Sequence, residues 1–179
     1  TYQTTNTYRR KTSLVFAILL TMKYNKVLVT GGSGFVGKRL QKIRPQWDYV
    51  NSNDANLANM DECCELLSKY RPDAVIHLAA KVGGIKENAE KPASFFLQNI
   101  SMNTNIVEAC YKMGVRRLLS ALSTCAFPDV VSSYPFTESA ILEGPPATTN
   151  LPYGFSKRAL WVQTKAYREQ YGLNYSTFC

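Results

Sequence analysis

The amino-acid sequence predicts an α/β fold with a doubly wound parallel sheet. Three observations predict it: short apolar segments alternate with longer amphipathic ones, the segments 26–30 and 73–80 are apolar on both faces, and a glycine-rich turn follows the first of them. Strands buried on both faces and joined by helices form parallel sheets. A chain of 179 residues can form one such domain and bury roughly 70% of its unfolded surface.

The first half of the chain supplies two strands and two helices. Residues 26–30, KVLVT, form an apolar strand that ends at glycines, and residues 34–43 follow with apolar positions at helical spacing. Residues 47–51, WDYVN, are the second strand. The amphipathic segment 58–70 is a helix that Pro72 ends, because proline disfavours helical backbone in the residue before it.

The second half continues the alternation. Residues 73–80, DAVIHLAA, are the third strand. Two long helices are expected at 92–114 and 153–172, each closed by a glycine at its C-terminal cap. Strand 116–123 follows the first of these helices and strand 173–179 follows the second. We expect this fifth strand to be incomplete, because the chain ends within it.

The charge of the chain favours an anionic partner. The formal net charge is +8, but the basic residues are spread along the chain and lack the clustered pattern of a nucleic-acid module. We therefore expect no nucleic-acid partner and favour phosphates on a small ligand. A merely solvated basic surface is the alternative.

The cysteines and the single histidine limit the chemistry. An odd number of cysteines without C-x-x-C spacing predicts neither a disulfide framework nor a zinc site, and indicates a reducing, cytoplasmic setting. His77 is the only histidine, which excludes a multi-histidine metal site and favours a structural role at a strand end. No bound metal is expected. The cysteines are Cys63, Cys64, Cys110, Cys125 and Cys179.

The first residues are expected to lie outside the domain. RRKTSLVFAILL has a basic start and an apolar run of seven residues, which is too short to span a bilayer, and no small-residue cleavage site follows it. Met22 comes next. We interpret residues 1–21 as a non-domain extension and residues 22–179 as the domain, with no membrane partner; a real anchor is the alternative.

The turn after the first strand predicts a dinucleotide site. Gly31, Gly34 and Gly37 stand three apart between a strand and a helix, where glycines allow a tight turn, close approach to a pyrophosphate and helix–strand packing. This context makes the predicted fold Rossmann-like. The residues expected to bind the cofactor in this turn are Gly31, Gly32, Ser33, Gly34, Phe35, Val36 and Gly37.

The end of the second strand favours NADP(H). A site for NAD usually carries an acidic residue there, which binds the ribose hydroxyls. Here the strand ends in Asn51, Ser52 and Asn53, which would tolerate a 2′-phosphate. Asp54 follows closely, so NAD stays open as the alternative.

A second motif predicts acid–base chemistry. In YGFSK, Tyr153 and Lys157 stand four apart and share one face of a helix. A cationic lysine lowers the pKa of a nearby phenol, which could then exchange protons nearer neutral pH. Ser123 precedes this pair by thirty residues. Between them, 127–152 is an irregular segment that we interpret as an active-site loop.

Taken together, these motifs resemble the extended short-chain dehydrogenase/reductase family, which acts on nucleotide sugars. LVTGGSGFVGK, VIHLAAKVGG, LSTCAFPD and YGFSKR occur here in the family's order and spacing, and the resemblance covers about residues 23–179. KVGG and the STC of LSTCAFPD are similar to one branch in particular. Its NADPH-dependent members epimerise C3 and C5 of a GDP-4-keto-6-deoxymannose and reduce its C4 ketone.

The resemblance implies a role for each candidate residue. Ser123 would hydrogen-bond the substrate carbonyl, Cys125 would be the base that removes the neighbouring protons, Tyr153 would donate a proton and Lys157 would also hold the nicotinamide ribose. Asn99 would support the site through backbone contacts. The remaining assignments are Leu78, Ala79 and Ala80 along the cofactor, Val82 and Gly83 against the sugar, and Asn56 and Leu57 beside the adenine, although the family more often has aspartate where Asn56 stands.

The resemblance also implies a part beyond this chain. Family members continue into a C-terminal domain that binds the GDP-sugar and supplies a histidine acid, a role for which His77 stands at the wrong place in the chain order. This chain is therefore expected to be truncated before that domain, and at best to bind cofactor alone. A homodimer through helices 92–114 and 153–172 is expected. The alternatives are a nucleotide-sugar 4-epimerase or dehydratase, or a non-catalytic NADP sensor.

Overall fold

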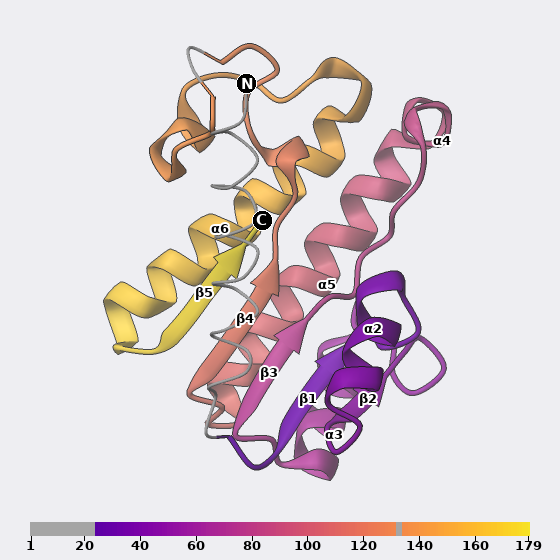
Figure 1. The fold of residues 1–179 in the computed structure, drawn as a ribbon, viewed down its shortest axis with the longest axis vertical. Coiled ribbons are helices and arrows are strands. Elements are labelled where there is room, and N and C mark those ends of the chain that lie inside the picture. The colour runs from indigo at the N-terminus through magenta and orange to yellow at the C-terminus, as the bar shows by residue number, and fades with distance from the viewer. Residues whose placement is uncertain (1–23, 132–133) are drawn as a thin grey trace, which may run out of the picture.

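The sheet has the predicted parallel, doubly wound form. The computed structural model describes residues 24–131 and 134–179, and in them one five-stranded sheet has the order β2-β1-β3-β4-β5 with every neighbouring pair parallel (Figure 1). The expectation for residues 1–21 lies outside the described residues. The strands are β1 (Val27–Thr30), β2 (Asp48–Val50), β3 (Ala74–His77), β4 (Arg117–Ala121) and β5 (Asn174–Phe178).

Helices cover both faces of the sheet. Apolar residues of α3, α5 and α6 share one cluster with every second residue of the strands, whereas α2 packs on the opposite face. Figure 1 shows α5 and α6 lying side by side along the sheet. The helices are α2 (Phe35–Ile43), α3 (Met60–Tyr70), α4 (Ile85–Glu90), α5 (Pro92–Lys112) and α6 (Leu151–Tyr171).

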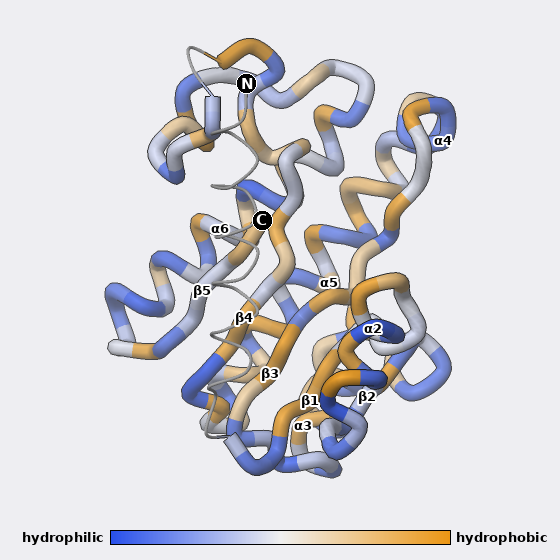
Figure 2. The backbone as a smooth tube through the Cα atoms, in the orientation of Figure 1, coloured by the Kyte–Doolittle hydropathy of each residue, from blue (hydrophilic) through white to orange (hydrophobic). Residues whose placement is uncertain are grey.

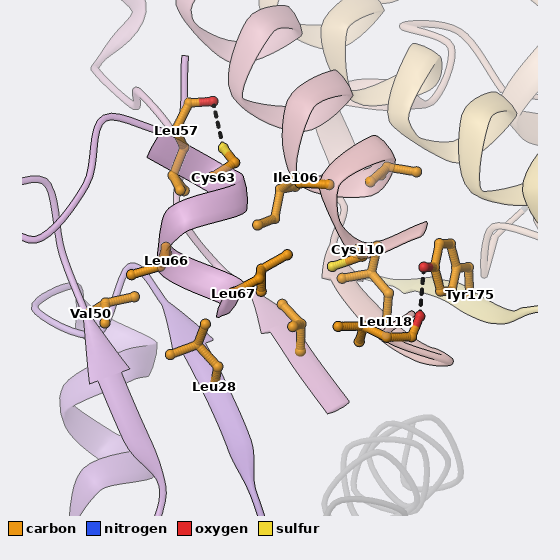
Figure 3. Packing of buried hydrophobic residues seen from close by; sticks show 14 of the residues in the cluster. Leu28, Val50, Leu57, Cys63, Leu66, Leu67, Ile106, Cys110, Leu118 and Tyr175 are labelled. Atoms are coloured by element: carbon orange, nitrogen blue, oxygen red, sulfur yellow. Dashed lines mark hydrogen bonds between the residues drawn. The ribbon is translucent and has the colours of Figure 1, made fainter. Parts of the chain in front are cut away.

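The larger core lies between the sheet and α3, α5 and α6. Figure 3 shows Leu28 and Leu118 from the strands packed with Leu67 and Ile106 from the helices. The Tyr175 hydroxyl is satisfied inside this core by donating to the Val115 carbonyl oxygen at 2.7 Å. Figure 2 shows hydrophobic residues gathered along β1 and β3, the strands with apolar contacts on both faces.

The strand order changes direction beside β1. The chain leaves β1 for β2 on one side and returns to β3 on the other. In such sheets the loops that follow the two central strands diverge, and ligands bind in the crevice at their carboxyl ends. The predicted cofactor residues after β1 and β3 therefore belong to the same edge of the sheet.

The region after the third strand differs from the sequence prediction. The third strand ends at His77, three residues earlier than expected, and residues 85–90, to which no helix or strand was assigned, form α4. This helix is only six residues long, so it has too few turns to show a hydrophobic period. Asn88 stabilises it by donating from Nδ2 to the carbonyl oxygens of Gly83 (2.9 Å) and Gly84 (3.0 Å).

The described part of segment 127–152 packs against α6. It is largely irregular, as predicted, but it holds the 3₁₀ helices Glu138–Leu142 and Thr148–Asn150, and α6 begins inside it at Leu151. Four of its buried or adjoining apolar residues, Ala126, Phe127, Ala140 and Ile141, form a small core. Arg158 of α6 also binds it, because Nε donates to the Ala126 carbonyl oxygen at 2.5 Å and a terminal nitrogen donates to that of Gly144 at 2.6 Å. The segment is thereby fixed to the helix that carries Tyr153.

Candidate functional site

The turn after β1 forms a cradle that only glycine can build. Gly31 has a φ of +71°, and a Cβ there would lie 2.7 Å from the Ala79 nitrogen and 2.8 Å from the Leu78 carbonyl carbon. A Cβ at Gly37 would lie 2.5 Å from the Gly32 carbonyl oxygen. The turn therefore packs closely against the residues that follow β3, and α2 begins at the end of the turn.

This cradle fits a pyrophosphate. The N-terminal cap of α2 is Gly34, which offers no side-chain acceptor to the amides of the first turn. Those amides and the positive end of the helix dipole are free to bind an anion. Ser33, Phe35 and Val36 are exposed in the same turn, and Phe35 is 93% exposed. A dinucleotide would cover these side chains.

The end of β2 forms a closed turn. The Asp54 carboxylate accepts from the Asn51 backbone amide at 2.8 Å, and the Asn53 amide donates to Asn51 Oδ1 at 2.9 Å. Ser52 is exposed beside them. Because Asp54 is already engaged by the backbone, it is poorly placed to bind both hydroxyls of a ribose, which favours the NADP interpretation.

The two adenine-side residues are placed differently from each other. Asn56 is exposed, and its Oδ1 accepts from the Ala58 amide at 3.1 Å. The Leu57 side chain is buried in the main core, and its carbonyl oxygen accepts from Cys63 Sγ at 3.4 Å (Figure 3). Leu57 could therefore contact a nucleotide only through its backbone.

The segment after β3 is positioned by Asn99 of α5. Asn99 Oδ1 accepts from the Lys81 amide and its Nδ2 donates to the Lys81 carbonyl oxygen, both at 2.9 Å. These are the backbone contacts predicted for Asn99. Leu78, Ala79 and Ala80 are half-buried before this residue, whereas Val82 and Gly83 after it are exposed.

Ser123, Cys125 and Tyr153 meet at the carboxyl edge of the sheet. Ser123 lies two residues beyond β4, and its Oγ accepts from the Cys125 amide at 3.2 Å in the 3₁₀ turn Thr124–Ala126. The Ser123 hydroxyl and the Cys125 thiol both lie close enough to the Tyr153 phenol to act on its pKa. The structure therefore brings Tyr153 of α6 to the turn that carries Ser123 and Cys125.

The pKa of Tyr153 differs in direction from the sequence prediction. Burial raises it, the neighbouring Ser123 hydroxyl lowers it, and the thiols of Cys125 and Cys179 raise it further. The ammonium group of Lys157 lies 6.0 Å from the centroid of the Tyr153 ring and donates to a backbone carbonyl oxygen, and its charge does not outweigh the effect of burial. Tyr153 therefore remains a protonated phenol near neutral pH and is suited to donate a proton.

Lys157 is a buried cation with one backbone partner. Its side chain is 2% exposed, and Nζ donates to the Ala121 carbonyl oxygen at 2.9 Å. Burial lowers its pKa to about 8. The remaining donors of the ammonium group are available to ribose hydroxyls, as the predicted role requires.

Gly154 brings α6 against the turn that carries Cys125. A Cβ at this position would lie 2.4 Å from the Cys125 carbonyl oxygen and 2.8 Å from Pro146 Cβ. Sequence reasoning missed this residue and Arg158. A glycine inside the first turn of a helix was the available signal, because glycine there is otherwise unfavourable.

Replacing Gly154 with alanine is expected to separate Cys125 from Tyr153. Alanine favours helix by about 1 kcal/mol, but the overlap with backbone forces a shift that costs roughly 1–3 kcal/mol, so we expect net destabilisation. Urea unfolding measures it. Gly84→Ala is the matched control, because no heavy atom lies within 4 Å of its added Cβ and its φ is −69°. Equal stability of the two variants would contradict this role for Gly154.

Within residues 24–131 and 134–179, no helix combines the length and apolar character needed to cross a membrane. No three histidine, cysteine or acidic side chains in these ranges are grouped so that they could hold a metal ion.

Comparison with known proteins agrees with the motifs. The chain is similar to a probable GDP-L-fucose synthase of Drosophila melanogaster, with 39% identity over 85% of this chain and 49% of the fly protein. A GDP-L-fucose synthase of Dictyostelium discoideum is also 39% identical, over 84% of this chain and 49% of its own length. A GDP-L-fucose synthetase of Naegleria fowleri bound to NADP is 40% identical with a TM-score of 0.76, over 86% of this chain and 48% of that one.

The fold and the site define a class of protein. A doubly wound sheet with a glycine cradle after its first strand is typical of a dinucleotide-binding domain. The model of the NAD dependent epimerase/dehydratase family matches residues 27–178, and the chain belongs to that family. It spans about half the length of the curated relatives it matches.

Proposed function

We propose that the complete protein is a GDP-L-fucose synthase. Such an enzyme epimerises C3 and C5 of GDP-4-keto-6-deoxy-D-mannose and reduces the C4 ketone with NADPH. The observation that carries the proposal is the Cys125 thiol beside the Ser123 hydroxyl and near the Tyr153 phenol. Reduction alone has no use for a thiol at this place, whereas epimerisation needs a base there. The names of the relatives from Drosophila melanogaster and Dictyostelium discoideum support the same activity.

Epimerisation uses the ketone as an electron sink. The hydroxyls of Ser123 and Tyr153 hold the C4 oxygen, so the electron pair of a departing C3 or C5 proton is delocalised onto that oxygen. Cys125 takes the proton as a thiolate, which is the reactive form of a thiol. A proton delivered by an acid on the opposite face of the sugar inverts the carbon and restores the ketone. His77 does not supply it, because its side chain is fully buried.

Reduction follows at the same carbonyl. NADPH, when bound, supplies a hydride to C4. Tyr153 donates its phenolic proton to the C4 oxygen, so that one hydride and one proton convert the ketone to a hydroxyl. The raised pKa of Tyr153 suits this direction, because the proton is present near neutral pH. Ser123 keeps the oxygen in line with the phenol.

The residues that would hold NADP(H) follow the carboxyl edge. The amides at the start of α2 bind the pyrophosphate, and Asn51 and Ser52 face the 2′-phosphate. Leu78 to Ala80 line the path toward the nicotinamide, and Lys157 binds its ribose. The relative from Naegleria fowleri bound to NADP supports this choice of cofactor. The GDP-sugar would approach Val82 and Gly83.

We also propose a cytoplasmic homodimer. Both long helices expose apolar side chains, Phe96 and Leu97 on α5 and Phe155 and Val162 on α6, and a second copy would cover them. All five cysteines are free thiols, as is usual in a reducing compartment. Sedimentation of the complete protein tests whether it is a homodimer.

The proposed activity is tested with the complete protein, GDP-4-keto-6-deoxy-D-mannose and NADPH in D₂O. We expect NADPH oxidation and a product that carries deuterium at C3 and C5. A product reduced at C4 without deuterium at either carbon would mean a simple reductase. NADPH binding without oxidation would favour a cofactor sensor, and either result would contradict the proposal.

A further inference from the structure

A row of polar side chains crosses the sheet just below its carboxyl edge. Thr30, His77, Ser120 and Thr177 are register partners on four neighbouring strands, β1, β3, β4 and β5. Register partners point to the same face of a sheet, here the face covered by α5 and α6. The first three are fully buried. Buried polar groups in a core are retained at a cost, so their partners are informative.

A directed chain of hydrogen bonds runs through this row. The Ala79 amide donates to Thr30 Oγ1 at 3.4 Å, and Thr30 Oγ1 lies 2.8 Å from His77 Nδ1. His77 Nε2 lies 3.1 Å from Asn103 Oδ1 on α5. Asn103 Nδ2 donates to the Ser156 carbonyl oxygen on α6 at 3.3 Å. The chain therefore links the end of β1 to the first turns of α6.

The directions of these bonds fix the tautomer of His77. The Ser156 carbonyl only accepts, so Asn103 must turn its amide nitrogen toward it and its oxygen toward His77. His77 Nε2 must then carry the hydrogen and donate, which leaves Nδ1 to accept from the Thr30 hydroxyl. Each donor in the chain meets an acceptor only when the imidazole is neutral.

The surroundings of His77 keep it neutral. Burial and, to a smaller extent, the nearby ammonium group of Lys157 together lower its pKa to about 3, against the opposing effect of the hydrogen bond with Asn103. His77 is thus a fixed donor and acceptor at working pH and does not exchange protons with a substrate. Its role has to be geometric.

The two ends of the chain reach the two halves of the site. Thr30 directly precedes Gly31 of the cofactor cradle, and its hydroxyl also holds the Ala79 amide at the end of β3. At the other end, Ser156 directly precedes Lys157, and its Oγ donates to the Tyr153 carbonyl oxygen at 2.7 Å. His77 stands between these ends and is hydrogen-bonded toward both of them.

We propose that His77 is a positioning residue that fixes the distance between the cofactor cradle and the helix turn carrying Tyr153 and Lys157. Its Nδ1 positions the cradle through Thr30, and its Nε2 positions α6 through Asn103. The catalytic half of this inference rests on the proposed function. The cofactor half rests only on the geometry of the cradle.

The two nitrogens can be separated by substitution. A glutamine amide reaches the place of Nε2 and an asparagine amide that of Nδ1. His77→Gln therefore keeps the bond to Asn103 and loses the bond to Thr30, and His77→Asn does the reverse. His77→Leu loses both at similar volume. Ser120→Ala is the matched control. Among the described residues the Ser120 Oγ is buried without a hydrogen-bond partner, so this side chain belongs to the row of polar residues across the sheet but takes no part in the chain of hydrogen bonds.

The experiment compares the four variants in the complete protein by NADPH titration, turnover and hydrogen exchange. His77→Leu is expected to weaken NADPH binding and to lower kcat, each on the order of tenfold, and to speed exchange in peptides spanning 77–81 and 151–160. His77→Gln should recover kcat but not NADPH affinity. His77→Asn should recover affinity but not kcat. Ser120→Ala should match the wild type in all three.

A purely structural histidine would give a different result. All three His77 variants would then lose thermal stability while kcat per folded molecule and NADPH affinity stayed at wild-type values, and this outcome would overturn the inference. Absence of turnover in the wild type would contradict the proposed function alone. NADPH affinity and hydrogen exchange would then still decide whether His77 positions the cradle and α6.

Discussion

Replacing Cys125 with serine is expected to slow exchange of the C3 and C5 hydrogens of the ketosugar by about 10³-fold, the scale of a lost general base. A serine hydroxyl fills the same space but ionises at far higher pH than a thiol, so it cannot take the proton. The hydrogen bond from the residue 125 amide to Ser123 comes from the backbone and survives. Reduction of an already epimerised ketosugar should therefore continue. Deuterium incorporation in D₂O measures the first step, and NADPH oxidation measures the second.

Cys179→Ser is the matched control for this prediction. Both thiols lie near the Tyr153 phenol, so a general effect of thiol loss would appear in either variant. Only Cys125→Ser should lose exchange. If exchange persists in that variant, the thiol is not the base. A 4-epimerase needs no base at the carbons beside the ketone, and it would then be the better-supported function within the same family.

The cofactor cradle could be predicted from the sequence because its signal is local. Gly31 and Gly37 are needed for contacts made within a few residues of the turn or with the next strand in the sheet, and a strand–turn–helix pattern places them. The closeness of Ser123 to Tyr153 was also predictable, since Ser123 follows the carboxyl end of β4 and Tyr153 lies in the first turn of α6, the next long helix along the chain. Spacing alone gives the neighbourhood of such groups.

What spacing could not give is the electrostatic state of the groups. A lysine one helical turn from Tyr153 was expected to lower the pKa of the phenol, yet burial dominates and the ammonium group turns to the Ala121 carbonyl oxygen. The direction of a pKa shift depends on burial and on where a flexible side chain points. An i, i+4 spacing in the sequence determines neither of these. The bridge from Thr30 to Ser156 through His77 was hidden for the same reason, because its members come from four elements.

Lys157→Met is expected to stabilise the folded protein while lowering its reductase activity on the order of 10²-fold. The activity falls because the ribose and the phenol lose a positioned cation, and misplacement of reacting groups costs about that much. The stability rises because Lys157 is a buried cation whose pKa falls from 10.5 to about 8 on folding. At about 1.4 kcal/mol per pKa unit, keeping it charged costs the folded state about 3 kcal/mol. Loss of the hydrogen bond to the Ala121 carbonyl oxygen destabilises the variant by roughly 1 kcal/mol. We therefore expect a net increase of about 2 kcal/mol in the free energy of unfolding.

The pH dependence of this gain identifies its cause. Between pH 8 and 10.5 the unfolded chain binds the lysine proton and the folded chain releases it, so the stability of the wild type rises with pH across this window. The advantage of Lys157→Met should therefore be full below pH 8 and disappear by about pH 10.5. Lys165→Met on the same helix removes an exposed lysine paired with Glu169, and should change stability by less than about 0.5 kcal/mol at any pH. The prediction is contradicted if Lys157→Met is no more stable than the wild type at pH 7, or if its advantage persists at pH 11. Either result would show that burial does not penalise the charge of the Lys157 ammonium group as its lowered pKa implies. The bound cofactor would then not have to supply further hydrogen-bond acceptors to this group.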